Sequence, residues 1–186
     1  VERLVGKLGK PVVRKAVLEF VKAIGANFVL GETIASAQLR GRSLRKLGYS
    51  FSYDMLGERA LTQDDADKYF TRYKDALKII TGPDNISVKL SALHPRYEYL
   101  KCNRVVNELA PKIVELIQLA ESNNASVTID AEEADKLDLS FMVVEKVLEL
   151  YTPKPGSLGF ALQAYQKRAF WVIDYIANLA KEHNTI

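Results

Sequence analysis

The feature of this sequence that most constrains its fold is an alternation of short apolar runs with longer helical patterns. The short runs start near residues 49, 86, 126 and 158. Each repeat takes about 30 to 40 residues, which is the length that a strand and a helical crossover to the next parallel strand require. The alternation predicts an α/β fold with a parallel sheet, either a (β/α)8 barrel or a doubly wound open sheet.

Helix and turn signals separate the short runs. Thr62 begins the first helical pattern, with Asp65 three positions later as in a capping box, and Tyr73 is one of the apolar positions that follow at helical spacing. Residues 82–85 are typical of a turn. The predicted strands cover residues 49–56, 86–90, 127–129 and 158–162, and the apolar helical stripes cover residues 66–80, 105–120, 137–148 and 172–180.

The first 48 residues precede the repeating units and predict two helices of their own. The first helix covers residues 11–24 and has Pro11 at its start, where a missing N–H costs nothing. The second covers residues 32–47, and Gly48 follows it at the position where a glycine typically ends a helix. We therefore expect a leading helical segment, residues 1–48, before the βα units of residues 49–186.

Composition places the chain among ordinary globular proteins, with 48% hydrophobic and 26% charged residues. Its apolar runs are shorter than the roughly 18 residues of a membrane span, and residues 1–10 lack the apolar core of a signal peptide. Cys102 is the single cysteine, so an intramolecular disulfide is excluded. These features predict a cytoplasmic protein.

Positive charge is concentrated at the start of the chain. Residues 1–50 contain ten Lys or Arg and three Asp or Glu, whereas the net charge of the whole chain is only +3. The block Arg40, Arg42, Arg45 and Lys46 has no interleaved aromatic residues, which disfavours a nucleic-acid site. A solvated helix surface explains the charge most simply, and a DNA- or membrane-binding module stays open as an alternative function.

Polar side chains stand at the carboxyl ends of all four predicted strands. In a (β/α)8 barrel these ends carry the catalytic groups, and an open sheet binds ligands at the same edge. The residue types therefore indicate an enzyme with an anion-binding rim and leave the reaction open. The strand-end residues are Asp54, Lys89, Asp130, Glu132 and Gln163.

Lys89 is the most informative of these residues because it stands between Val88 and Leu90 in an apolar run. A buried lysine is costly unless it is paired, so we expect it to meet Asp54 or Asp130. It suits either a structural ion pair or an anion site for a substrate carboxylate. A lysine near a barrel strand end, with carboxylates nearby, also suits the Schiff-base chemistry of an aldolase, which is the main rival interpretation.

Other common sites are not indicated. His94 and His183 are far apart, so no metal site is expected, and neither a Walker A motif nor a GxGxxG motif occurs. No GxSxG segment marks a serine nucleophile. Gln163 could bind a ligand or bridge backbone groups.

Four segments nevertheless resemble one known family. They are SYDMLGE at 52–58, VKLSALHPRY at 88–97, IDAEE at 129–133 and QAYQKR at 163–168, and GETI at 31–34 fits as well. In this order and spacing they resemble the proline dehydrogenase domain of bifunctional PutA proteins. The resemblance covers nearly the whole chain. It implies a distorted (β/α)8 barrel that holds FAD noncovalently and oxidises L-proline to Δ1-pyrroline-5-carboxylate, with electrons passed to a membrane quinone.

The resemblance also implies roles for catalytic residues. Lys89 matches the lysine that binds the proline carboxylate, Asp54 an aspartate that pairs with a cation, and Glu58 a glutamate that closes an ion-pair gate over the substrate. The family's substrate-binding arginine pair and a flavin-contacting arginine are expected beyond Ile186. Four βα units cannot close an eight-stranded barrel, so this chain is expected to supply the N-terminal half and to be catalytically incomplete alone.

The cofactor set that the resemblance implies is Asp130, Ala161 and Gln163, where Ala161 contributes through its backbone. The expected partners are L-proline and a quinone, which would be met at the inner face of the membrane, and a homo-oligomer is compatible with the resemblance. DNA is expected only through a domain that these 186 residues do not contain. An aldehyde dehydrogenase domain is likewise implied only for a longer parent protein.

Overall fold

A computed structural model describes residues 9–25, 29–55, 57 and 59–185. The chain divides into two compact units, Val1–Tyr49 and Ser50–Ile186. Within the part of the chain that is described, no helix combines the length and the apolar character that crossing a membrane requires. The candidate site is built by the second unit.

The first unit contains helices α2 (Lys10–Gly25) and α3 (Ile34–Lys46). A capping box begins α3, because the Thr33 hydroxyl accepts from the Ser36 amide and the Ser36 hydroxyl accepts from the Thr33 amide. Gly48 follows the helix with a φ of 90°, a backbone conformation that glycine adopts at no steric cost. Both predicted helices are confirmed, and α3 starts two residues later than expected because its cap is Thr33.

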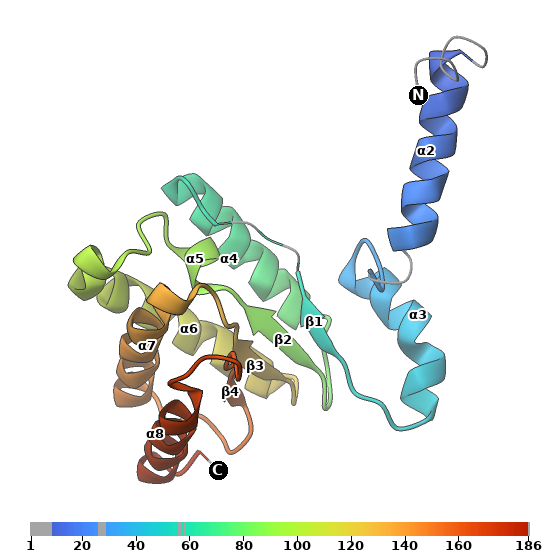
Figure 1. Cartoon of the computed structure of the whole chain (residues 1–186). Helices are drawn as coiled ribbons and strands as arrows, with labels where there is room; N and C mark the ends of the chain where they lie inside the picture. Colours follow the sequence, from blue (N-terminus) through green and yellow to red (C-terminus); the bar gives the residue numbers. More distant parts are fainter. Residues whose placement is uncertain (1–8, 26–28, 56, 58, 186) are drawn as a thin grey trace. The chain divides into compact units, whose positions relative to one another are not determined.

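The second unit has four strands that pair in parallel and in chain order (Figure 1). A doubly wound sheet reverses its strand order at a switch point, whereas a barrel adds each strand next to the preceding one. The consecutive order therefore favours the barrel over the open sheet. The strands are β1 (Ser52–Asp54), β2 (Asn85–Val88), β3 (Ser126–Ile129) and β4 (Leu158–Phe160).

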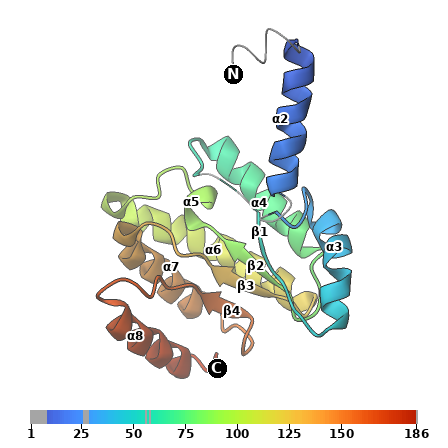
Figure 2. The same cartoon turned by 45° about the vertical axis from the view of Figure 1, so that its right-hand side comes forward.

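A long helix follows each strand, as the alternation predicted. Thr62 caps the first of them in the predicted capping box with Asp65. The second helix of the set, α6, packs against α4, α7 and β3, and Figure 2 shows α6 and α7 side by side. The four helices are α4 (Gln63–Leu77), α6 (Cys102–Ser122), α7 (Leu137–Leu150) and α8 (Ala169–Glu182), and the short elements are α5 (Leu90–Leu93), η1 (Tyr99–Lys101) and η2 (Ala134–Lys136).

The two faces of the sheet differ in polarity. Ile86, Val88, Val127 and Ile129 are fully buried and form the core with the apolar stripes of the helices. The alternate positions on the other face are polar. They include Asn85, whose amide nitrogen lies 3.0 Å from the Ser126 hydroxyl and 2.9 Å from the Thr128 hydroxyl. The strand pairing places Gly159 beside Thr128. A Cβ at position 159 would lie 2.8 Å from the Thr128 hydroxyl, so only glycine avoids a clash with this polar side chain.

Three strands end earlier than their apolar runs predicted. β1 covers residues 52–54 of the predicted 49–56, and β4 ends at Phe160. β2 ends at Val88, because Lys89 is the first residue of the turn into α5. Lys89 therefore lies just outside the strand, where its amide is free of the ladder and its side chain faces the carboxyl ends of the strands.

Candidate active site

An open cleft of about 610 Å³ lies at the carboxyl ends of the strands. Residues that follow each of the four strands contribute to its lining. Its volume falls within the roughly 300 to 1,000 Å³ that is typical of small-molecule sites. The lining residues are Gly57, Arg59, Lys89, Ser91, residues 131–134, Gln163 and Tyr165.

Lys89 pairs with two carboxylates at this edge of the sheet. Its Nζ lies 2.9 Å and 3.0 Å from the two carboxylate oxygens of Asp54, and 2.8 Å from Oδ2 of Asp130. The Lys89 side chain is 23% exposed, compared with 44% for Asp54 and 25% for Asp130. The expectation that Lys89 meets Asp54 or Asp130 is confirmed for both, so three successive strand ends converge on one ammonium group.

The charge of Lys89 is strongly stabilised. Burial by itself lowers the pKa of a lysine, but hydrogen bonds to Asp130 and Asp54 outweigh it, and the pKa of Lys89 lies above its ordinary value. Schiff-base catalysis needs a neutral amine and a lowered pKa. The environment of Lys89 therefore keeps its amine protonated and disfavours the aldolase interpretation.

The backbone around Lys89 is fixed by side chains from outside β2. The Lys89 amide donates to the hydroxyl of Tyr73 on α4 over 3.1 Å, and the Ser91 amide donates to Oε1 of Glu132 over 3.0 Å. The Ser91 carbonyl in turn accepts from the amide of Ala60. The segment that carries the ammonium is thus held by α4, by the loop after β3 and by the loop after β1.

Glu132 and Tyr73 are the residues of this site that sequence reasoning gave no role. The sequence indicates Glu132 only as a polar strand end. In the structure, burial raises the pKa of Glu132 against the opposing effect of the hydrogen bonds from Ser91. Tyr73 belongs to the apolar stripe of its helix and is 1% exposed. Burial raises the pKa of Tyr73 to about 12, so its hydroxyl stays neutral. Neither hydrogen bond could be predicted from spacing, because both depend on how loops fold back.

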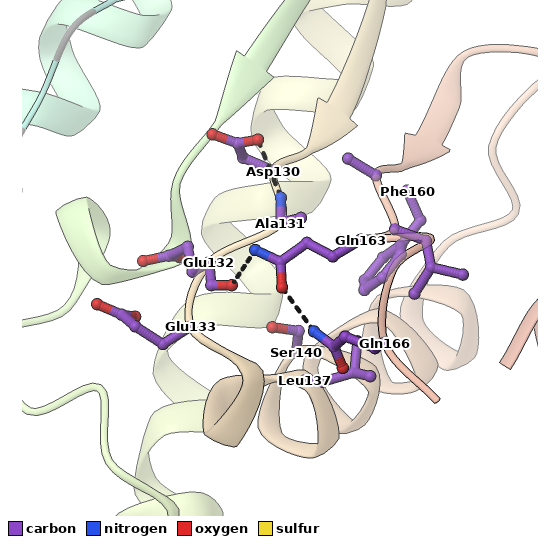
Figure 3. A pocket seen from close by; sticks show the side chains of 11 residues that line it. Asp130, Ala131, Glu132, Glu133, Leu137, Ser140, Phe160, Gln163 and Gln166 are labelled. Carbon is purple, nitrogen blue, oxygen red and sulfur yellow. Dashed lines mark hydrogen bonds between the residues drawn. The ribbon is translucent and has the colours of Figure 1, made fainter. Parts of the chain in front are cut away.

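The predicted cofactor residues lie together on the β3 and β4 side of the cleft. Asp130, Ala161 and Gln163 line one small cavity of about 10 Å³, which is drawn in Figure 3. The Gln163 amide nitrogen donates to the Glu132 carbonyl over 3.0 Å, so Gln163 does bridge to the backbone. The Ala161 amide donates to the Ile129 carbonyl over 2.8 Å. Because the amide is engaged, the backbone group with which Ala161 would contact a ligand is its carbonyl.

Two further residues were considered from the sequence, Glu58 and His94. Glu58 lies outside the described residues, although its neighbours Gly57 and Arg59 line the cleft. His94 is 1% exposed, with Nε2 placed 3.1 Å from a carboxylate oxygen of Glu108, and burial lowers its pKa. His94 is therefore a satisfied core residue. Within the described ranges, no group of three or more His, Cys, Asp or Glu side chains is placed to hold a metal ion.

Comparison with known sequences gives one consistent family. The family model for proline dehydrogenase matches residues 37–186. The Bifunctional protein PutA of Klebsiella aerogenes is 44% identical over 188 residues, which cover 96% of this chain and 14% of that protein. The chain therefore spans only a small part of the length of this curated relative.

Solved structures of PutA proteins have the same fold as this chain. A mutant of Bradyrhizobium japonicum Proline Utilization A (PutA) matches with a TM-score of 0.74 at 44% identity, covering 98% of this chain and 19% of that one. The Bdellovibrio bacteriovorus PutA structure matches with a TM-score of 0.84 at 19% identity, covering 94% of this chain and 20% of that one. At this identity the match shows the fold alone. Together with the consecutive parallel strands, these matches identify the fold as part of a (β/α)8 barrel.

Proposed function

Because the chain belongs to the proline dehydrogenase family, we propose that it forms the first half of a barrel in which a flavin-dependent enzyme oxidises L-proline. The product is Δ1-pyrroline-5-carboxylate, and the electrons pass to a quinone. The enzyme is cytoplasmic and meets the quinone at the inner face of the membrane. Its role is the flavin-dependent half of proline breakdown to glutamate.

The observation that carries this proposal is the ammonium group of Lys89 in the cleft. A lysine ammonium is a compact charge with three donors, which suits the carboxylate of an amino acid. Its raised pKa keeps it charged throughout the neutral range. Lys89 is therefore the group that binds the proline carboxylate and orients the ring carbon from which the hydride leaves.

The charge balance of the site indicates that Lys89 does not bind the carboxylate alone. Asp54, Asp130 and Lys89 together carry a formal charge of about −1 near neutral pH. A substrate carboxylate therefore needs a second cation, and Arg59 lines the same cleft. Asp54 is the more exposed of the two carboxylates, so it is the one free to turn to another cation when substrate enters.

The residues at the β3 and β4 ends fit a flavin ring in their donor and acceptor chemistry. The edge of the ring presents both N–H and C=O groups, and Gln163 offers a donor and an acceptor in one amide. The Ala161 carbonyl and the Asp130 carboxylate add acceptors at the same small cavity. We propose that these three residues hold FAD. When bound, the flavin supplies the electron acceptor for proline oxidation, and this chain supplies position and electrostatics.

Glu58 is proposed as the residue that closes over bound substrate through an ion pair. This assignment is supported by its chain neighbours Gly57 and Arg59, which line the cleft. L-proline and a quinone are the proposed partners, in an enzyme compatible with a homo-oligomer. The DNA- or membrane-binding alternative for residues 1–50 stays a prediction, as does the aldolase alternative, which the charge of Lys89 disfavours.

Substitution of Lys89 by Met in the full-length, flavin-loaded enzyme tests the carboxylate assignment. We expect the proline KM to rise at least tenfold, because methionine keeps the length of the side chain and removes its charge, while the flavin remains bound. Lys78→Met is the matched control, since the Lys78 side chain at the end of α4 is 63% exposed and pairs with Asp75 in that helix. An unchanged proline KM in the Lys89 variant would refute the assignment.

A further inference from the structure

We propose that Glu132 is a positioning residue for the substrate lysine, and that it links the substrate side of the site to the cofactor side. Its carboxylate holds the segment that carries Lys89, and its carbonyl holds the amide of Gln163. This inference rests on the proposed function and adds a residue to it.

The first link is needed because Lys89 has left the strand. β2 ends at Val88, so the sheet no longer fixes the backbone that carries the ammonium. Buried backbone amides must find other partners. The Lys89 amide finds Tyr73, and the Ser91 amide finds Glu132 at 3.0 Å. Of these two partners, Glu132 is the one that lies in the cleft lining.

The second link uses the main chain of the same residue. The Glu132 carbonyl accepts from Nε2 of Gln163 over 3.0 Å, and Oε1 of Gln163 accepts from Gln166, as Figure 3 shows. Gln163 belongs to the loop after β4, where the cofactor residues gather. A shift of Glu132 would therefore move both the loop of Lys89 and the amide of Gln163.

The hydrogen bonds of Glu132 show that its carboxylate acts on the backbone and not through an ion pair with Lys89. Lys89 contacts Asp54 and Asp130, whereas the carboxylate of Glu132 accepts from a backbone amide of the following turn. What the site requires at position 132 is therefore an acceptor at a fixed place. Glutamine keeps such an acceptor and loses the charge, whereas alanine loses both.

A double-mutant cycle in the full-length, flavin-loaded enzyme tests the inference. The variants are Glu132→Ala, Glu132→Gln, Lys89→Met and Lys89→Met with Glu132→Ala, and Glu149→Ala on the exposed surface of α7 is the control. The KM for L-proline and kcat are measured per bound flavin, which is quantified from the visible spectrum, and thermal melting reports folding. If Glu132→Ala does not fold, Glu132→Asp takes its place in the cycle.

We expect Glu132→Ala to raise the proline KM about tenfold, and Glu132→Gln to remain within about threefold of the parent. In the Lys89→Met background, Glu132→Ala should change the KM less than about twofold, because its effect acts through Lys89. Equal effects in both backgrounds, or a Gln variant as impaired as the Ala variant, would overturn the positioning role and leave the proposed function intact. If Lys89→Met itself leaves the KM unchanged, the carboxylate assignment fails and this inference fails with it.

Discussion

At the scale of single residues, the site depends on groups that place Lys89 as much as on Lys89 itself. The ammonium lies between Asp54 and Asp130, and the backbone beneath it is held by the hydroxyl of Tyr73 and the carboxylate of Glu132. Both holding groups come from outside the strand that delivers the lysine. Because binding geometry is sensitive to small shifts, residues without substrate contact are expected to affect proline affinity.

Replacement of Tyr73 by Phe tests this dependence with a minimal change. The variant keeps the buried ring and removes the acceptor of the Lys89 amide, which leaves an N–H group without its partner. We expect the free energy of unfolding to fall by about 1 to 2 kcal/mol and the proline KM to rise. Urea unfolding and steady-state kinetics measure both, with the exposed Tyr99→Phe as the control. If stability and KM both match the parent, the Tyr73 hydroxyl does not hold this segment.

The sequence predicts the ion pairs of Lys89 better than the hydrogen bonds to Tyr73 and Glu132 that position its backbone. A lysine in an apolar run needs a counter-charge, so the pairing of Lys89 with Asp54 or Asp130 follows from burial energetics. Tyr73 at an apolar helical position looks like an ordinary core residue, and only the fold shows where its hydroxyl points. Glu132 looks like one more polar strand end until the loops bring it to the Ser91 amide.

At the scale of elements, the buried carboxylate of Glu121 joins α6 to the segment that leads into β4. Glu121 accepts from the Tyr151 hydroxyl over 2.6 Å, from the Lys154 amide over 2.7 Å and from the Ser157 hydroxyl over 2.6 Å. Burial alone would raise its pKa, but these three hydrogen bonds outweigh burial, and the pKa of Glu121 lies below its ordinary value. The carboxylate therefore stabilises the fold when it is ionised.

This linkage predicts an acid-dependent loss of stability. A lowered pKa gives stabilisation that is fully present above the ordinary value of 4.5 and is lost as the pH falls through the lower folded value. Glu121→Gln should cost about 1 kcal/mol or more at pH 7 and should show a smaller loss between about pH 4.5 and 3 than the parent. Thermal melting across this range measures the effect, with Glu115→Gln as an exposed control. The same pH dependence in Glu121→Gln and the parent would contradict the account.

The elements themselves follow closely from local signals. The capping box of Thr62 and Asp65 and the glycine after α3 are where the sequence predicts them. Strand ends are less predictable, because an apolar run does not show where its pairing partner stops. Lys89 and Leu90 continue the alternation of polar and apolar residues in β2, yet the backbone turns there into α5.

At the scale of the whole molecule, the order of the strands is the decisive observation. Alternating strands and helices suit a barrel and a doubly wound sheet equally, so the sequence pattern leaves both open. The pairing of β1, β2, β3 and β4 in chain order favours the barrel, and the family match agrees with it. Four strands do not close a barrel of eight, so we propose that the substrate and cofactor groups assigned to this chain form one side of a larger site.

We propose above that this chain contributes to a flavin enzyme that oxidises proline. The most direct test is the visible absorption spectrum of the purified full-length protein, recorded under anaerobic conditions before and after addition of L-proline. We expect flavin absorption bands that bleach when proline is added and that persist with an equal concentration of glycine, which has the carboxylate and amine but no ring. A flavin-loaded protein whose bands do not change with proline would contradict it.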